Sequence, residues 1–136
     1  MTIIADLDRT ASPRGARTTL ASARHTWYAD LAASAGGEAT APEPHDLLDS
    51  ALAACTTLTL ELYLRRKDWN VSSLHVEVDR DERKGTDGVV EYTLARTIAI
   101  AGALSDEQRG QLLAVANRCP IHRVLEGRIA VRTTLA

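Results

Sequence analysis

One long helical pattern constrains this chain more than any other feature of its sequence. From Pro44 to Lys67, apolar residues recur every three or four positions, which is the spacing of one face of a helix. Asp46 and Asp49 lie near its start and three basic residues close it, as the helix dipole favours. Because its middle is also apolar on the other faces, the pattern predicts a helix that is buried on every side and crosses the whole domain.

Shorter patterns flank this helix. Residues 71–80 and 89–101 alternate apolar and polar side chains, so they predict a hairpin of two half-buried strands with a polar tip at residues 81–88. The small-residue segment 31–42 contains two adjacent glycines and is expected to be a surface loop. Three further short strands are expected at residues 17–20, 24–29 and 128–135.

Two short helices are expected after the hairpin. Ser105 and Gln108 have the spacing of a capping box, which opens a helix whose pattern stops at Cys119. Pro120 suits the first turn of another short helix, which Gly127 ends. Strands, a long helix, a hairpin, two helices and a strand in this order indicate an α+β fold, and a chain of 136 residues is expected to form a single domain over residues 1–136.

Composition excludes several classes of protein. Hydrophobic residues make up 45% and charged residues 25%, which is typical of a globular protein and not of a disordered one. The net charge of −2 gives no basic excess for a nucleic acid or an anionic membrane. The first residues do not resemble a signal peptide, and no uninterrupted apolar run reaches the length of a membrane helix. We therefore expect a soluble cytoplasmic protein.

The chain has two cysteines, and each allows two interpretations. Cys55 lies among apolar residues in the middle of the long helix, where a thiol most often only packs and is inert unless a cation reaches it. Cys119 is expected at the N-cap before Pro120, where the helix terminus and its basic neighbours favour a thiolate. The alternative for Cys119 is a small core residue at a helix junction.

Other chemistry has little support in the sequence. The four histidines and two cysteines include no pair with the usual spacing of zinc ligands, and no phosphate-binding or hydrolase motif occurs. We therefore expect no metal ion and no organic cofactor. The charged residues of segment 91–96, Arg96 among them, are interpreted as ordinary charge on the surface of a strand.

Several motifs resemble the OsmC/Ohr family. Pro44-His45-Asp46-Leu47-Leu48 and Ala51-Leu52-Ala53-Ala54-Cys55-Thr56 are similar to its first-cysteine helix, and Arg118-Cys119-Pro120-Ile121-His122 is similar to its second-cysteine motif. The resemblance implies curved antiparallel sheets wrapped around long central helices in an intertwined homodimer, with active sites at the subunit interface. It also implies thiol-dependent reduction of organic hydroperoxides in response to oxidative stress.

The resemblance also implies roles for both cysteines. In that scheme Cys55 attacks the peroxide and becomes a sulfenic acid, Cys119 resolves it as a disulfide, and a dithiol, of the lipoyl type in the Ohr branch, reduces the disulfide. An apolar pocket around Leu48, Leu52 and Leu58 would favour organic hydroperoxides over hydrogen peroxide. The alternative function is that of a dimeric binding or redox-sensing protein without catalysis, whose apolar pocket lies at the interface.

The family's activating arginine comes from the N-terminal strands. Arg17 is the first candidate here, with Arg14 and Arg24 as alternatives. The Ohr branch holds this arginine with a glutamate ten residues before the first cysteine, where this chain has His45. Asp46 or Glu43 is therefore expected to replace that glutamate, which places the chain in the broader OsmC-like branch.

Overall fold

The helical pattern at the centre of the sequence forms one continuous helix, α1, from Pro44 to Lys67, with the predicted bounds. Its buried residues lie four positions apart and form a single stripe, which consists of Leu52, Thr56, Leu60 and Leu64. The opposite face is open, because Leu58 is 63% exposed and Leu62 is 65% exposed. The expectation of burial on every side is therefore wrong for this chain, since the elements of one chain cover only one face of the helix.

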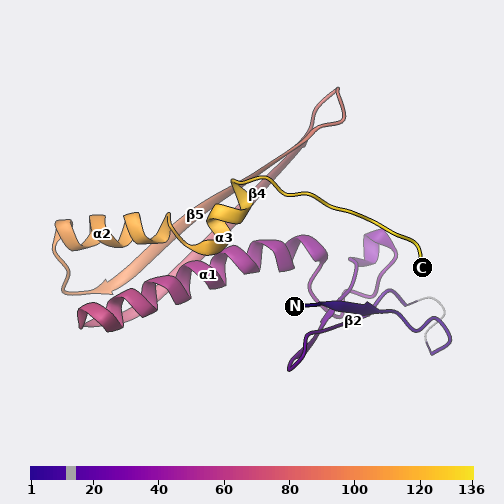
Figure 1. Cartoon of the computed structure of the whole chain (residues 1–136), viewed down its shortest axis with the longest axis horizontal. Coiled ribbons are helices and arrows are strands. Elements are labelled where there is room, and N and C mark those ends of the chain that lie inside the picture. The colour runs from indigo at the N-terminus through magenta and orange to yellow at the C-terminus, as the bar shows by residue number, and fades with distance from the viewer. Residues whose placement is uncertain (12–14) are drawn as a thin grey trace. The chain divides into compact units, whose positions relative to one another are not determined.

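The computed structural model describes residues 1–11 and 15–136, so Arg14 lies outside the described residues. The chain divides into two compact units, Met1–Leu48 and Asp49–Ala136 (Figure 1). The first unit contains an antiparallel sheet in the order β1-β2-β3. The strands β2 (Thr18–Ala21) and β3 (Thr26–Ala29) confirm the two that were predicted here, whereas β1 (Ile4–Asp6) was not predicted.

A buried carboxylate organises the loop that follows β3. Asp30 is 2% exposed, and it accepts hydrogen bonds from the N–H of Leu31 (2.8 Å) and from both the N–H (2.9 Å) and the hydroxyl (2.7 Å) of Thr40. The bonds from Thr40 outweigh the effect of burial and lower the pKa of Asp30 to about 2. At Gly37 a Cβ atom would collide with the backbone carbonyl of Leu31, so this close turn requires glycine. The loop is thus held by hydrogen bonds to the buried carboxylate of Asp30, in addition to lying at the surface.

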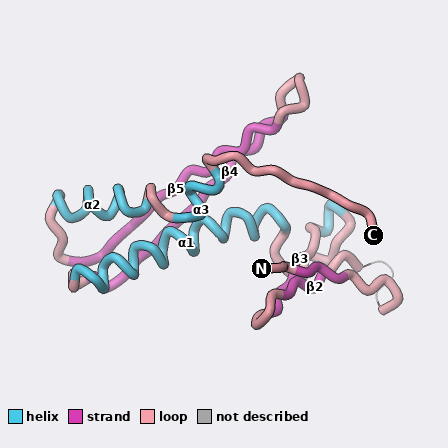
Figure 2. The backbone as a smooth tube through the Cα atoms, in the orientation of Figure 1, coloured by secondary structure: helices cyan, strands magenta, loops and turns pink. Residues whose placement is uncertain are grey.

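The second unit contains a long antiparallel hairpin of β4 (Val71–Lys84) and β5 (Val90–Gly102). β4 is longer at the tip than predicted, because cross-strand pairing continues to Lys84 opposite Val90, whereas β5 begins one residue later than predicted. The turn is closed by a hydrogen bond from the N–H of Gly85 to the carbonyl of Val89 (2.8 Å). In Figures 1 and 2 the hairpin runs along the helices of this unit and its tip extends beyond them.

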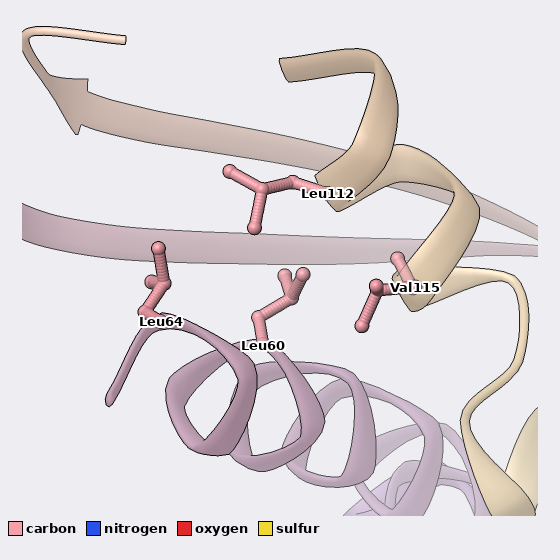
Figure 3. Close-up of a cluster of buried hydrophobic side chains, with 5 residues drawn as sticks. Leu60, Leu64, Leu112 and Val115 are labelled. Atoms are coloured by element: carbon pink, nitrogen blue, oxygen red, sulfur yellow. The ribbon is translucent and has the colours of Figure 1, made fainter. Parts of the chain in front are cut away.

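Two helices complete the second unit. In α2 (Asp106–Ala116) the predicted capping box of Ser105 and Gln108 is present, and α3 (Pro120–Leu125) follows after Cys119. Figure 3 shows Leu60 and Leu64 of α1 pointing towards α2. With residues of α2 they form the core cluster of Leu60, Leu64, Leu112, Val115 and Ala116.

The strand expected at residues 128–135 is absent. Within the described residues no strand pairs with this segment, and Val131 is 85% exposed. A strand needs a neighbouring strand to satisfy its backbone hydrogen-bonding groups, so an alternating sequence without a neighbour does not form one.

By length and composition α1 could cross a membrane, with a mean hydropathy of 1.3 over its most apolar 18-residue window. The core helix of a soluble protein passes the same test. Because α1 supplies Leu60 and Leu64 to the core, this single helix is only a weak indication of a membrane span.

The core predicts a sharp contrast between two adjacent leucines of α2. Leu112 is 1% exposed and Leu113 is 59% exposed. Leu112→Ala should lower the free energy of unfolding by about 2–5 kcal/mol, because it leaves a cavity in the core. Leu113→Ala is the matched control and should change it by no more than about 0.5 kcal/mol in urea denaturation. Equal effects of the two substitutions would contradict the packing described here.

Candidate active site

The structure brings the two predicted cysteines together. Cys55 is partly buried on α1, and Cys119 lies with no exposed surface at the start of α3. The side chain of Cys55 is close enough to Cys119 to lower the pKa of the Cys119 thiol. Both thiols therefore belong to one site, formed within the second unit.

Local backbone rules place Cys119. It has the extended conformation of an N-cap, with φ −61° and ψ 144°, and Pro120 begins the helix, as the sequence predicted. The N–H of His122 donates a hydrogen bond to Cys119 Sγ at 3.3 Å. The sulfur thus takes the place that a serine or aspartate oxygen usually has at a helix start.

Arg96 of β5 reaches the same site, which the sequence interpretation missed. Its Nη1 donates to the hydroxyl of Thr56 at 2.9 Å and lies 3.9 Å from Cys119 Sγ. Its Nη2 donates to Asn117 Oδ1 at 2.9 Å and to His122 Nδ1 at 3.2 Å. The expectation of ordinary surface charge at position 96 is therefore wrong.

A signal for Arg96 was present in the alternation of β5. Positions 92, 94, 96, 98 and 100 are partly buried, and the positions between them are exposed. Arg96 thus takes a core-facing position among the apolar residues Leu94 and Ile98. A charged residue at such a position needs partners inside the protein.

Thr56 is a second site residue that the sequence did not single out. It has no exposed surface, and its hydroxyl donates to the carbonyl of Leu52 at 2.7 Å while it accepts from Arg96. The same oxygen lies 3.9 Å from Cys119 Sγ. Because a hydroxyl has only one proton, the Leu52 carbonyl and a Cys119 thiolate would compete for it.

The surroundings of Cys119 favour its thiolate. Burial raises the pKa of the Cys119 thiol, but the hydrogen bond from the His122 N–H, the interactions with the side chains of Cys55 and Thr56 and the positive charge of Arg96 together lower this pKa below its ordinary value. The net effect is that the Cys119 thiol is more acidic than an ordinary cysteine.

Hydrogen-bond partners also assign the tautomer of His122. A guanidinium only donates, so His122 Nδ1 accepts from Arg96. The hydrogen of the neutral ring is then on Nε2, which lies 3.0 Å from Glu126 Oε2. Glu126 and Arg96 together fix the orientation of the imidazole.

A cavity of about 320 Å³ adjoins this site, at the lower end of the usual size of ligand pockets. Arg96 and His122 belong both to its wall and to the cysteine site. Of the three leucines expected around a pocket, Leu52 lines this cavity, Leu58 lines a different hollow beside β4, and Leu48 lies in the first unit. The cavity is lined by Leu52, Tyr92, Thr93, Leu94, Arg96, His122, Leu125 and Glu126.

The remaining predicted site residues lie in the first unit. The guanidinium of Arg17 lies 4.1 Å from the ring centroid of Tyr28, and Arg24 is exposed between β2 and β3. Asp46, in the first turn of α1, accepts a hydrogen bond from the N–H of Glu43 at 3.1 Å. A role for these residues beside Cys55 stays a prediction.

In the described part of the chain, no three His, Cys, Asp or Glu side chains lie close enough together to bind a metal ion.

Solved structures with the same fold come from several bacteria. An OsmC-like protein from Mycoplasma pneumoniae is 24% identical, with a TM-score of 0.76 over 93% of this chain and 86% of the other. A putative osmotic stress induced and detoxification response protein from Psychrobacter arcticus is 17% identical, with a TM-score of 0.75 over 91% and 87%. An organic hydroperoxide resistance protein OsmC from Legionella pneumophila is 18% identical, with a TM-score of 0.69 over 93% and 90%. No curated protein matches the sequence significantly.

At these identities the solved structures show a shared fold. They confirm the α+β architecture of antiparallel sheets and helices that the sequence predicted. The family model of OsmC-like proteins matches residues 36–134, which include both cysteines and most of the chain. The protein therefore belongs to the OsmC-like protein family.

Proposed function

We propose that this protein is a thiol-dependent peroxidase that reduces organic hydroperoxides through Cys55 and Cys119. The observation that carries the proposal is the proximity of the two thiols, one of which lies beside the guanidinium of Arg96. This is the arrangement that separates the enzyme from a binding protein whose cysteines only pack. Family membership supports the proposal, since the similar Legionella pneumophila protein is named an organic hydroperoxide resistance protein.

The exposure of the two sulfurs suggests their order of reaction. Cys55 is partly exposed, so its thiolate attacks the terminal peroxide oxygen, the O–O bond breaks, an alcohol leaves and a sulfenic acid forms. The Cys119 thiolate then attacks the Cys55 sulfur, water leaves after proton transfer, and a disulfide forms. A dithiol, of the lipoyl type in the family's Ohr branch, then reduces this disulfide and is itself oxidised to a disulfide.

The cavity supports an organic substrate. Leu52, Leu94 and Leu125 give it apolar walls, which suit the carbon chain of a hydroperoxide. The hydroxyl of Tyr92 donates to Asp49 Oδ1 at 2.6 Å, and Arg80 donates to Asp49 Oδ2 at 3.0 Å, so this wall is held in place. Hydrogen peroxide has no group that would use the apolar walls.

The resemblance assigns Arg17, held by Asp46, to the activation of Cys55. A guanidinium within about 4–6 Å of a thiolate lowers the thiol pKa by about 1–3 units. Arg17→Ala should therefore raise the pH at which Cys55 reacts with an alkylating agent by at least about one unit, as measured by mass spectrometry of the labelled peptide. An unchanged profile in folded protein would remove Arg17 from the site.

We further propose that residues 1–136 form one domain of a cytoplasmic protein that is a homodimer. The open face of α1 supports the dimer, because Leu58 and Leu62 lie one turn apart and are both more than half exposed. The same helix of a second copy has the matching apolar face, as a two-fold interface requires. The match of the family model to residues from both units supports the single domain.

Sedimentation tests the dimer. The protein should sediment as a dimer at micromolar concentration, and Leu58→Asp combined with Leu62→Asp should shift it towards the monomer because a charge would be buried at the interface. Leu113→Asp, an exposed position on α2, is the control and should leave the dimer intact. A stable folded monomer of the unsubstituted protein would end this proposal.

Peroxide consumption tests the roles of the cysteines. With an alkyl hydroperoxide and a dithiol, Cys55→Ser should abolish consumption, because no sulfenic acid can form. Cys119→Ser should allow one turnover and then stop, with Cys55 trapped as sulfenic acid or driven to sulfinic acid. Mass spectrometry identifies these products, and the variant without either cysteine supplies the blank rate.

Two outcomes would contradict this scheme. If Cys119→Ser loses the first turnover while Cys55→Ser keeps it, the two roles are reversed. If the unsubstituted protein consumes no hydroperoxide although both thiols are reduced, the result favours the alternative function of a binding or redox-sensing protein.

A further inference from the structure

Arg96 differs from the other two arginines of its hairpin in the groups that bind its guanidinium. Arg80 donates to the carboxylate of Asp49, and Arg83 donates to that of Asp81. In the described part of the chain, the side-chain partners of Arg96 are Thr56, Asn117, His122 and Cys119, and none is a carboxylate. Among these four partners only the thiol of Cys119 can become an anion.

The guanidinium is also held in a fixed orientation. Nη1 is bound by Thr56, whose hydroxyl is itself bound to the backbone of α1. Nη2 is bound by Asn117 and by His122 Nδ1, and Glu126 holds the other nitrogen of that ring. A thiolate at Cys119 therefore needs no rearrangement to meet a positive charge.

We propose that Arg96 is a catalytic residue that keeps Cys119 as a buried thiolate and so sets the direction in which the disulfide is reduced. The inference rests on the proposed function, in which a Cys55–Cys119 disulfide is formed. It assigns to Arg96, on β5, a role separate from that predicted for Arg17 beside Cys55.

The reduction step follows from exposure and from leaving-group chemistry. A thiolate of the dithiol reductant attacks Sγ of Cys55, which is the partly exposed sulfur. A bond forms between these sulfurs, the Cys55–Cys119 bond breaks, and its electron pair leaves on Cys119. The second thiol of the reductant then attacks its own sulfur in the mixed disulfide, releases Cys55 and leaves the reductant oxidised to a disulfide.

Arg96 favours this order because the better leaving group is the sulfur whose thiolate is more stable. The hydrogen bonds and charge around Cys119 lower the pKa of its thiol. Attack on Cys119 is also disfavoured by access, because this sulfur has no exposed surface.

The first experiment titrates Cys119 by the ultraviolet absorbance of its thiolate. Cys55→Ser leaves Cys119 as the only thiol, and the variant without either cysteine supplies the tyrosine background. Adding Arg96→Met should raise the midpoint by about 1–3 pH units, because one positive charge close to the sulfur is lost. Arg96→Lys should raise it less, since the charge stays but the forked geometry is lost.

Arg83→Met is the matched control, since it removes an arginine from the same hairpin at an exposed ion pair. It should leave the midpoint unchanged. Circular dichroism checks the fold, and Arg96→Gln, which keeps hydrogen-bond donors without the charge, replaces Arg96→Met if that variant unfolds. A midpoint that does not change when the charge at position 96 is removed would overturn the proposal.

The second experiment locates the attacked sulfur. The unsubstituted protein is oxidised with diamide, treated briefly with 2-mercaptoethanol, quenched with acid and mapped by mass spectrometry. The mixed disulfide should be found on Cys55, and Arg96→Met should slow its formation. A mixed disulfide found mainly on Cys119, or a rate that does not depend on Arg96, would overturn the proposal. Neither experiment uses a peroxide, so failure of the peroxidase function is distinguished from failure of this inference.

Discussion

The buried stripe of α1 is the interaction on which both the core and the candidate site depend. Leu60 and Leu64 pack against α2, and Thr56, one turn earlier on the same stripe, is the point where Arg96 and Cys119 meet. Since Cys119 follows α2 by only a few residues, the packing of α2 on α1 also determines where its sulfur lies. Site and core are therefore continuous parts of one helix face.

A polar group on such a stripe is costly unless its hydrogen bonds are made. Among the described residues, every buried side-chain nitrogen or oxygen has a partner. Thr56 meets this requirement through Leu52 and Arg96, and Arg96 meets it through Asn117 and His122. The network thus lets a cation and an ionisable thiol lie beside an apolar core, where their interaction is stronger than it would be in water.

Local rules explain what the sequence predicted well. The bounds of α1, the capping box at Ser105 and the N-cap at Cys119 each depend on residues within one or two turns. Contacts between distant segments were not predictable in this way. The periodicity of the sequence does not reveal which face of α1 is covered. It also does not reveal the hydrogen bonds between distant residues, such as those of Asp30 with Thr40 and of Arg96 with Thr56. The alternation of β5 did mark position 96 as core-facing, but only the fold supplies its partners.

The complete burial of Cys119 affects how its sulfur is oxidised and how it reacts with thiol reagents. Conversion of a sulfur to sulfinic or sulfonic acid needs repeated encounters with oxidant molecules, which an enclosed sulfur does not meet in the folded state. Irreversible damage to the reduced protein is therefore confined to Cys55. For the same reason a bulky thiol reagent should label one cysteine at once in the native protein and two after unfolding, so the slow rate at which the second thiol reacts in the native protein reports how often the structure around Cys119 opens.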